Sequence, residues 1–142
     1  MQFEYELEVG ELTLDRCCRR SRALADLGGA DLVVSATDAV LVQALDRPMA
    51  MLFDQVLHNL VANSVSAEAT EASVTLSMAD QRLRGSFADN AGGFDPQLAL
   101  QRGGGLSRIR QALELVGGSF AIEPGGVAIH FELPTLLNEA VA

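Results

Sequence analysis

The sequence predicts an α+β protein, a two-layer sandwich in which helices pack on a sheet of mostly antiparallel strands. First, its 142 residues are 49% hydrophobic, which is enough for one packed domain with a single core. Second, apolar residues recur with helical spacing in separate blocks, at 14–27, 49–66 and 106–116. Third, short apolar runs on either side of turn residues predict hairpins at 73–88 and 119–133.

The predicted elements follow one another without a linker rich in proline or serine, so we expect a single domain over residues 1–142. The first half should contain a strand at Phe3–Val9, a helix at Leu14–Leu27 ended by Gly28 and Gly29, and strands at Asp31–Ala36 and Val40–Leu45. The second half should contain a helix at 49–66 opened by Pro48, strands at Ser73–Met78 and Leu83–Ala88, a helix at Leu106–Val116, and strands at Ser119–Ile122 and Val127–Leu133. Residues 135–142 are expected to be a frayed tail.

Composition excludes several classes of protein. A formal net charge of −9 argues against nucleic-acid binding, which needs a basic surface. No apolar run approaches the roughly twenty residues that span a bilayer, and the acidic start at Met1–Glu8 is neither a signal nor a transit peptide. Cys17 and Cys18 are adjacent, so they are unsuited to bridge each other, and no metal-ligand spacing is present. We therefore expect a protein of the cytoplasm.

Basic residues are concentrated in one short segment that contains Arg16, Arg19, Arg20 and Arg22. On a helix, such a cluster is usually a solvated face. The alternative is a docking surface for an acidic partner. The sequence alone leaves both interpretations open.

Two glycine clusters indicate a nucleotide site. A strand-like run ends in Asp89-Asn90-Ala91-Gly92-Gly93, and ten residues after Gly93 comes Gly103-Gly104-Gly105-Leu106, which opens a helix. A carboxylate at a strand end can accept a hydrogen bond from the exocyclic amine of a base. Glycines let the backbone approach phosphates closely, and a helix start offers unpaired N–H groups and the positive end of a dipole. The order of these features favours a bound nucleotide.

The predicted helix at 49–66 adds a third feature. Asn59 and Asn63 are four residues apart, so their amides project from one side of the helix, one turn above the other. Asparagine competes for backbone groups and is a mediocre helix former. Two of them inside an apolar helix call for polar partners, although a pair of satisfied, half-buried amides is the simpler alternative.

In order and spacing, these three segments resemble the ATP-binding boxes of the Bergerat-fold (GHKL) ATPases, and most closely the catalytic and ATP-binding (HATPase_c) domain of bacterial sensor histidine kinases. Residues 55–64 are similar to the asparagine box, 89–93 to the first glycine box and 103–106 to the second. The end of the chain, 115–134, is similar to the closing strand pair of that family. The resemblance implies a mixed, mostly antiparallel sheet covered by helices on one face.

The resemblance also implies ATP and Mg²⁺ as cofactors and gives residues their roles. Asp89 would bind the adenine amino group, Asn63 would hold Mg²⁺ with Asn59 beside it, and 94–102 would be a mobile lid. The implied nucleotide-binding residues are Asn59, Asn63, Asp89, Ala91, Gly93, Arg102, Gly103, Gly105 and Leu106. The phosphoacceptor histidine would lie on a separate dimerisation segment, and through it the partner would be a response regulator. No catalytic residue is therefore assigned within this chain.

The chain departs from the family pattern at three of the positions that bear on nucleotide binding. Ala91 replaces the first glycine of its box, a variant that the family also contains. Ser66 stands where a basic residue is usual, and Val127 where a threonine is frequent, and both changes predict weaker nucleotide binding. Asn59 stands where the related ATP hydrolases have a glutamate that activates water, and an amide cannot accept that proton.

The expected activity is transfer of the ATP γ-phosphoryl group to a histidine on another segment, as in a two-component sensor kinase. His58 and His130 are not expected to be acceptors, since neither lies on a helical hairpin. The alternatives are a serine kinase of the anti-sigma-factor type, which usually keeps a glutamate at the position of Asn59, and a degenerate nucleotide-binding or protein-docking module. The isolated chain is expected to be inactive without its phosphoacceptor.

Overall fold

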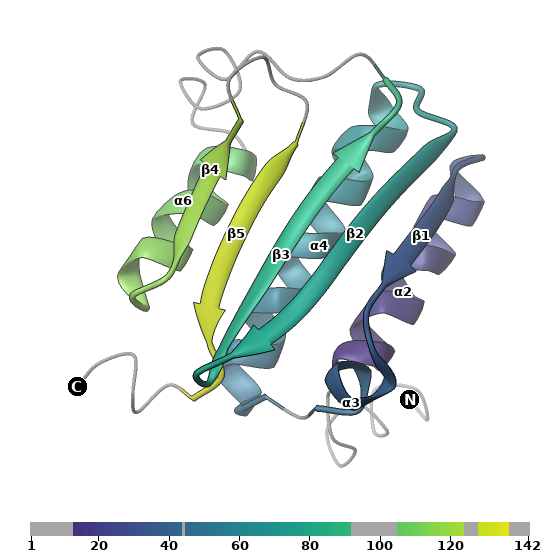
Figure 1. Cartoon of the computed structure of the whole chain (residues 1–142). Coiled ribbons are helices and arrows are strands. Elements are labelled where there is room, and N and C mark those ends of the chain that lie inside the picture. The colour runs from purple at the N-terminus through teal and green to yellow at the C-terminus, as the bar shows by residue number, and fades with distance from the viewer. Residues whose placement is uncertain (1–12, 44, 92–104, 124–127, 137–142) are drawn as a thin grey trace, which may run out of the picture.

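A computed structural model of the chain describes residues 13–43, 45–91, 105–123 and 128–136. Figure 1 shows one twisted sheet with the longer helices behind it, so that one face of the sheet is covered by helices. The other face carries no helix of the described part of the chain. The predicted two-layer α+β sandwich is therefore confirmed.

The sheet is mixed and mostly antiparallel, as expected. Its strands are β1 (Asp31–Ser35), β2 (Glu71–Ala79), β3 (Arg82–Asp89), β4 (Ser119–Ile122) and β5 (Ile129–Pro134). The spatial order is β1-β2-β3-β5-β4, with β1 parallel to β2 and the other neighbouring pairs antiparallel. The two predicted hairpins are therefore present. The predicted strand at Phe3–Val9 lies outside the described residues.

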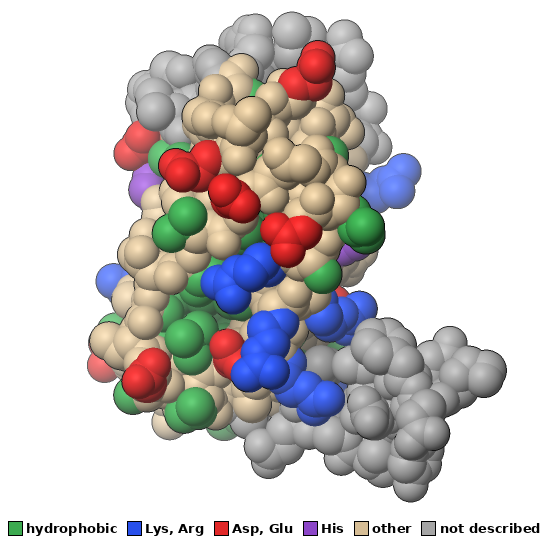
Figure 2. Space-filling view, turned by 90° about the vertical axis from the view of Figure 1, so that its right-hand side faces the viewer, with side chains coloured by type: hydrophobic (Ala, Val, Ile, Leu, Met, Phe, Trp, Pro, Cys, Tyr) green, Lys and Arg blue, Asp and Glu red, His purple; other side chains and the backbone are tan. Residues whose placement is uncertain are grey.

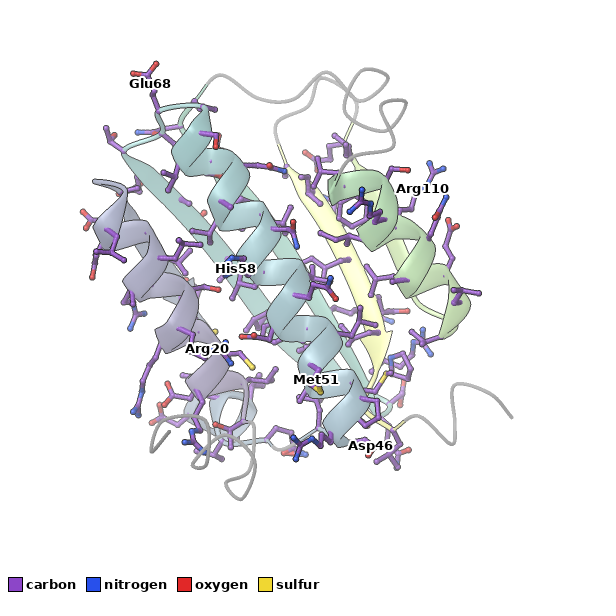
Figure 3. The ribbon with its side chains drawn as sticks, turned by 180° about the vertical axis from the view of Figure 1, so that it is seen from behind. Arg20, Asp46, Met51, His58, Glu68 and Arg110 are labelled. Atoms are coloured by element: carbon purple, nitrogen blue, oxygen red, sulfur yellow. The ribbon has the colours of Figure 1, made fainter. Side chains whose placement is uncertain are left out.

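Four helices are described: α2 (Leu14–Leu27), α3 (Asp38–Leu41), α4 (Arg47–Ser66) and α6 (Gly105–Leu115). Thr13 caps α2, because its hydroxyl oxygen accepts the backbone N–H of Arg16 at 3.3 Å. Pro48 occupies the first turn of α4, where its missing N–H costs least. Figure 3 shows α2, α4 and α6 side by side in front of the sheet, with α4 in the centre.

The predicted strand at Val40–Leu45 is wrong, because the chain forms the short helix α3 at Asp38–Leu41. The hydroxyl oxygen of Thr37 accepts the backbone N–H of Val40 at 3.3 Å and so caps the first turn. A capped turn holds its residues in helical geometry even where valine and leucine favour a strand. Thr37 is therefore the sequence signal that predicts a helix here instead of a strand.

The core is the layer between α4 and the sheet. Phe53 on α4 and Phe131 on β5 lie with ring centroids 6.2 Å apart and planes tilted by 42°. Phe131 covers Gly85 on β3, where a Cβ atom would lie 2.2 Å from the aromatic ring. Glycine is therefore required at this position, because it lets the ring pack directly on the strand. This packing fixes α4 over the middle of the sheet.

The end of the described chain is held by backbone hydrogen bonds. Thr135 is buried, its N–H donates to the Gln81 carbonyl at 3.0 Å, and its carbonyl accepts the Asp46 N–H at 3.0 Å. Thr135 belongs to the fold and not to a frayed end, whereas residues 137–142 of the predicted tail lie outside the described part.

The arginine cluster lies along α2. Figure 2 shows basic side chains across the middle of this edge of the molecule, with acidic side chains above and below them. Arg19 pairs with Asp15 at 2.6 Å, Arg20 pairs with Asp54 at 3.4 Å, and the Arg22 Nε donates to a β1 carbonyl at 3.3 Å. These contacts within the chain favour a solvated helix face.

The two cysteines are buried and free, on the side of α2 that faces the core. Burial, with smaller electrostatic contributions, raises the pKa of Cys17 to about 12 and that of Cys18 to about 11. Both are therefore neutral thiols at neutral pH and behave as small apolar side chains. Within the described residues, no helix combines the length and apolar character that crossing a bilayer requires.

Candidate functional site

The candidate site lies at one end of the sheet, where β3 ends, α4 ends and α6 begins (Figure 1). Alternate residues of β3 face the helices, because Leu83, Gly85 and Phe87 are all buried. Asp89 follows in the same alternation, so its carboxylate faces the helical layer and is half-buried. The strand thus positions a carboxylate beside the last turns of α4.

Two hydrogen bonds hold that carboxylate. The Ser64 hydroxyl of α4 donates to Oδ2 of Asp89 at 2.5 Å, and the Ala91 N–H donates to Oδ1 at 3.0 Å. An ionised carboxylate has about four acceptor positions, so two remain for a ligand. An amine of a bound base is a suitable donor for them. Asp89 and Ala91, both predicted as site residues, are therefore brought together.

Ser64 was missed by the sequence analysis. Its side chain is buried, with 1% of its surface exposed, on the face of α4 that also carries Leu60 and Val61. A hydroxyl on an apolar helix face requires a partner, because an unpaired buried polar group is costly. The same rule, which holds for the two asparagines of this helix, also singles out Ser64.

Asn90 was part of the glycine motif but had no predicted role. Its side-chain oxygen accepts the backbone N–H groups of Thr70 and Glu71 at 2.9 and 3.1 Å. Its side-chain nitrogen donates to the Thr70 hydroxyl at 2.8 Å. Asn90 therefore joins the end of β3 to the turn between α4 and β2. These hydrogen bonds keep Asp89 next to the end of α4.

Asn59 lies at the junction of α4 and α6. Its Nδ2 donates to the Gln55 carbonyl one turn earlier at 2.8 Å, which leaves Oδ1 directed at Gly105. A Cβ atom on Gly105 would lie 2.9 Å from this oxygen, so the start of α6 packs closely against the Asn59 side chain. Because α6 begins at Gly105, the N–H groups of its first turn, which have no acceptor within the helix, lie next to Asn59. Leu106 is buried behind them.

Asn63 is exposed, one helical turn beyond Asn59 and next to Ser64. An exposed amide at this place is accessible to a hydrated metal ion. Among the described residues, no group of three or more His, Cys, Asp or Glu could hold a metal by itself. The predicted site residues Gly93, Arg102 and Gly103, with the lid at 94–102, lie outside the described part.

The hollow beside the candidate site is small. A cavity of about 80 Å³ lies between α4 and α6 and includes Asn59 and Gly105 in its lining. Hollows of about 310 and 600 Å³ lie on the open face of the sheet and beside Met51 near the start of α4. Neither contains a predicted site residue, so the polar groups, and not cavity size, locate the site.

The two histidines lie on different elements, and neither contributes to the group of side chains around Asp89. His58 is exposed on the side of α4 that faces α2 (Figure 3). His130 lies on the open face of the sheet, where its Nε2 is 3.0 Å from Glu123 Oε1. The sheet therefore separates His130 from the helical layer that carries the candidate site.

Comparison with known proteins agrees with this geometry. The family model described as "Histidine kinase-, DNA gyrase B-, and HSP90-like ATPase" (HATPase_c) matches residues 50–137, more than half of the chain. The chain therefore belongs to this family. Members of the family bind ATP, usually with Mg²⁺. No curated protein sequence matches the chain.

Solved structures of histidine kinases share the fold. One nucleotide-free form of the catalytic domain of histidine kinase ThkA has a TM-score of 0.67 at 20% identity and covers 87% of this chain and 94% of its own. A second form has a TM-score of 0.66 at 22% identity, with the same coverage. The histidine kinase domain of the blue-light-activated kinase of Erythrobacter litoralis EL346 has a TM-score of 0.65 at 18% identity, over 87% of this chain and 61% of that one. The chain is thus an ATP-binding domain of the kinase and ATPase type, with the predicted GHKL fold.

Proposed function

We propose that residues 1–142 form one catalytic domain of a two-component sensor histidine kinase, which binds Mg-ATP and donates the γ-phosphoryl group to a histidine on a separate dimerisation segment. The observation that carries this proposal is the Asp89 carboxylate. It faces the helical layer with both oxygens held and with acceptor positions left for a base. Membership of the HATPase_c family supports ATP as the ligand.

The described residues are suited to the other parts of ATP. Asn63 offers an exposed amide oxygen of the kind that Mg²⁺ accepts beside phosphate oxygens and water. Gly105 and the N–H groups of the first turn of α6 lie next to Asn59, where phosphates would meet a helix N-terminus. The bound nucleotide supplies the phosphoryl group, and the chain supplies orientation and hydrogen-bond donors. Ala91, Gly93, Arg102, Gly103 and Leu106 complete the proposed set.

A protein acceptor is favoured over water by the chemistry of Asn59. The side-chain nitrogen of Asn59 is already committed to the Gln55 carbonyl, and its amide oxygen cannot take a proton at neutral pH. Water activation at this position is therefore absent from the proposed mechanism. The acceptor histidine comes from another segment, and a response regulator of the cytoplasm receives the phosphoryl group from it.

Two other functions compete with this one. A serine kinase of the anti-sigma-factor type would use the same site, and Asn59 argues against it because that class usually has glutamate there. A degenerate docking module is supported by the exposed Ser66 and by Val127, which remove expected nucleotide contacts. Phosphoamino-acid analysis of an acceptor protein distinguishes the first alternative, and nucleotide affinity the second.

Titration calorimetry with Mg-ATP and with ADP tests the proposal directly. We expect saturable binding of both nucleotides with one site per chain. No heat of binding up to millimolar nucleotide, in a sample whose far-UV circular dichroism shows a folded chain, would contradict the proposal and favour the docking module.

A further inference from the structure

We propose that Ser64 is a positioning residue for base recognition: its hydroxyl orients the Asp89 carboxylate toward an exocyclic amine of the nucleobase. This inference rests on the proposed nucleotide-binding function. Ser64 is not one of the residues that the family resemblance implies. It is the residue after Asn63, on the side of α4 that faces the sheet rather than solvent.

The first step of the argument is burial. The Ser64 side chain is 1% exposed, so its hydroxyl cannot exchange a protein partner for bulk water. Its oxygen lies 2.5 Å from Oδ2 of Asp89, and a hydroxyl next to an ionised carboxylate, which only accepts, must be the donor. The hydroxyl is therefore committed as a donor to that carboxylate.

The second step is that the carboxylate is held at both oxygens from different directions. Ser64 approaches Oδ2 from α4, and the Ala91 N–H approaches Oδ1 from the chain after β3. Rotation of the Asp89 side chain would break at least one of these bonds. The acceptor positions that remain are therefore fixed before a ligand arrives, and binding need not order them.

The third step concerns the choice of base. A fixed carboxylate accepts from an amine, as on adenine, and meets an oxo group, as on guanine, with acceptor facing acceptor. Because the Ser64 hydroxyl already donates to Oδ2, it is not available to donate to an oxo group instead. Ser64 and Asp89 together should favour an aminopurine over an oxopurine.

The same bond also ties α4 to β3, so a purely structural role must be distinguished from positioning. The probes are Mg-ATP and the Mg complex of purine riboside triphosphate, in which hydrogen replaces the 6-amino group. The positioning role predicts that Ser64→Ala weakens ATP binding about tenfold and changes binding of the second nucleotide by less than about twofold. Ser64→Cys, with a weaker donor of similar size, should lie between wild type and Ser64→Ala for ATP.

Ser21→Ala is a matched control, because Ser21 is also 1% exposed but lies on α2, and its hydroxyl has no hydrogen-bond partner among the described residues. It should bind both nucleotides like wild type. A second check combines Ser64→Ala with Asp89→Asn, and the serine substitution should then cause no further loss of ATP affinity.

Three results would overturn the inference while wild-type ATP binding, and with it the proposed function, still stands. They are an unchanged ATP affinity in Ser64→Ala, an equal loss for both nucleotides, or a full further loss in the Asp89→Asn background. If Ser64→Ala does not fold, an ATP affinity of Ser64→Cys equal to that of wild type overturns it, and a selective loss for ATP supports it. Failure of the wild-type chain to bind either nucleotide would overturn both proposals.

Discussion

Asp89 is the residue on which nucleotide recognition depends most in our proposal, because it presents a carboxylate to the helical layer at the end of β3. Two neighbouring residues keep Asp89 in place. Asn90 hydrogen-bonds the end of β3 to the turn before β2, and Ser64 donates to a carboxylate oxygen of Asp89. The recognition group is thus held by contacts from two other elements.

Asp89→Asn should greatly weaken binding of adenine nucleotides and leave the fold intact. The amide keeps the size of the side chain but removes its charge and can present a donor to the base amine. A loss of about 2 kcal/mol, roughly thirtyfold in affinity, is expected for a charged hydrogen bond in a half-buried site. Calorimetry measures the affinity. Asp80→Asn, in the turn between β2 and β3, is the control, and an unchanged affinity in Asp89→Asn would exclude the assignment.

Asn63→Ala should weaken binding of Mg-ATP more than binding of metal-free ATP. The amide oxygen is exposed, and in our proposal it contacts the metal ion rather than the nucleotide itself. Parallel titrations in Mg²⁺ and in EDTA give the two affinities for the variant and for wild type. The same fold loss in both buffers would show that Asn63 does not contact the metal.

At the scale of elements, the centre of the sheet is stabilised on both faces. On the covered face, Phe131 of β5 packs on Gly85 of β3. On the open face, Glu132 of β5 accepts from the Nε atoms of Arg82 and Arg84 of β3 at 2.8 and 2.7 Å. The strand that ends in Asp89 is therefore held firmly to its neighbour, which keeps the site in place.

The Glu132 contacts predict a dependence of stability on pH. The hydrogen bond from Arg82, and then that from Arg84, holds the pKa of Glu132 below its usual value of 4.5. A lowered folded-state pKa means that the contribution to stability is present above pH 4.5 and is lost as pH falls through the folded pKa. Glu132→Gln should therefore lower the free energy of unfolding by about 1 kcal/mol at pH 7, and by less in more acidic solution.

Urea unfolding followed by circular dichroism, from pH 7 down to pH 3, measures this difference. Glu114→Gln is the control, because the Glu114 side chain is 58% exposed and lies 4.0 Å from Arg110. Removing its charge should change the free energy of unfolding little at any pH. A difference between Glu132→Gln and wild type that stays constant with pH would contradict the prediction.

For the whole molecule, our proposal separates the ATP site from the acceptor histidine. Incubated alone with labelled ATP, the chain should neither phosphorylate itself nor hydrolyse ATP quickly. Asn59 cannot activate water, His130 lies across the sheet from the site, and His58 lies on the side of α4 that faces α2. Addition of the histidine-bearing helical hairpin of its own kinase should restore transfer at a rate that depends on concentration.

Mass spectrometry of the labelled products decides between the outcomes. Acid-labile phosphate on the added hairpin supports the proposal. The same label on His58 or His130 of the isolated chain would contradict the separation of roles. Acid-stable phosphate on a serine of another protein would instead indicate the serine-kinase alternative.

The sequence by itself determined the features that depend on local order. It predicted the two-layer α+β class, the helices over 14–27 and 49–66, and both hairpins. These features depend on apolar periodicity and turn residues, which are set by residues close together in the sequence. Through the spacing of its motifs it also indicated the family to which the chain belongs. Its error at Val40–Leu45 came from strand propensity in a segment where a threonine cap starts a helix.

Only the tertiary structure decided which distant groups meet. The parallel pairing of β1 with β2 joins strands that are separated by two helices, and no local pattern specifies it. Likewise, Ser64 and Asp89 are 25 residues apart and meet only because α4 packs across β3. Burial then commits the serine hydroxyl to the carboxylate, since no water can replace that partner. The sequence thus determined which chemical groups are present, and packing determined which of them touch.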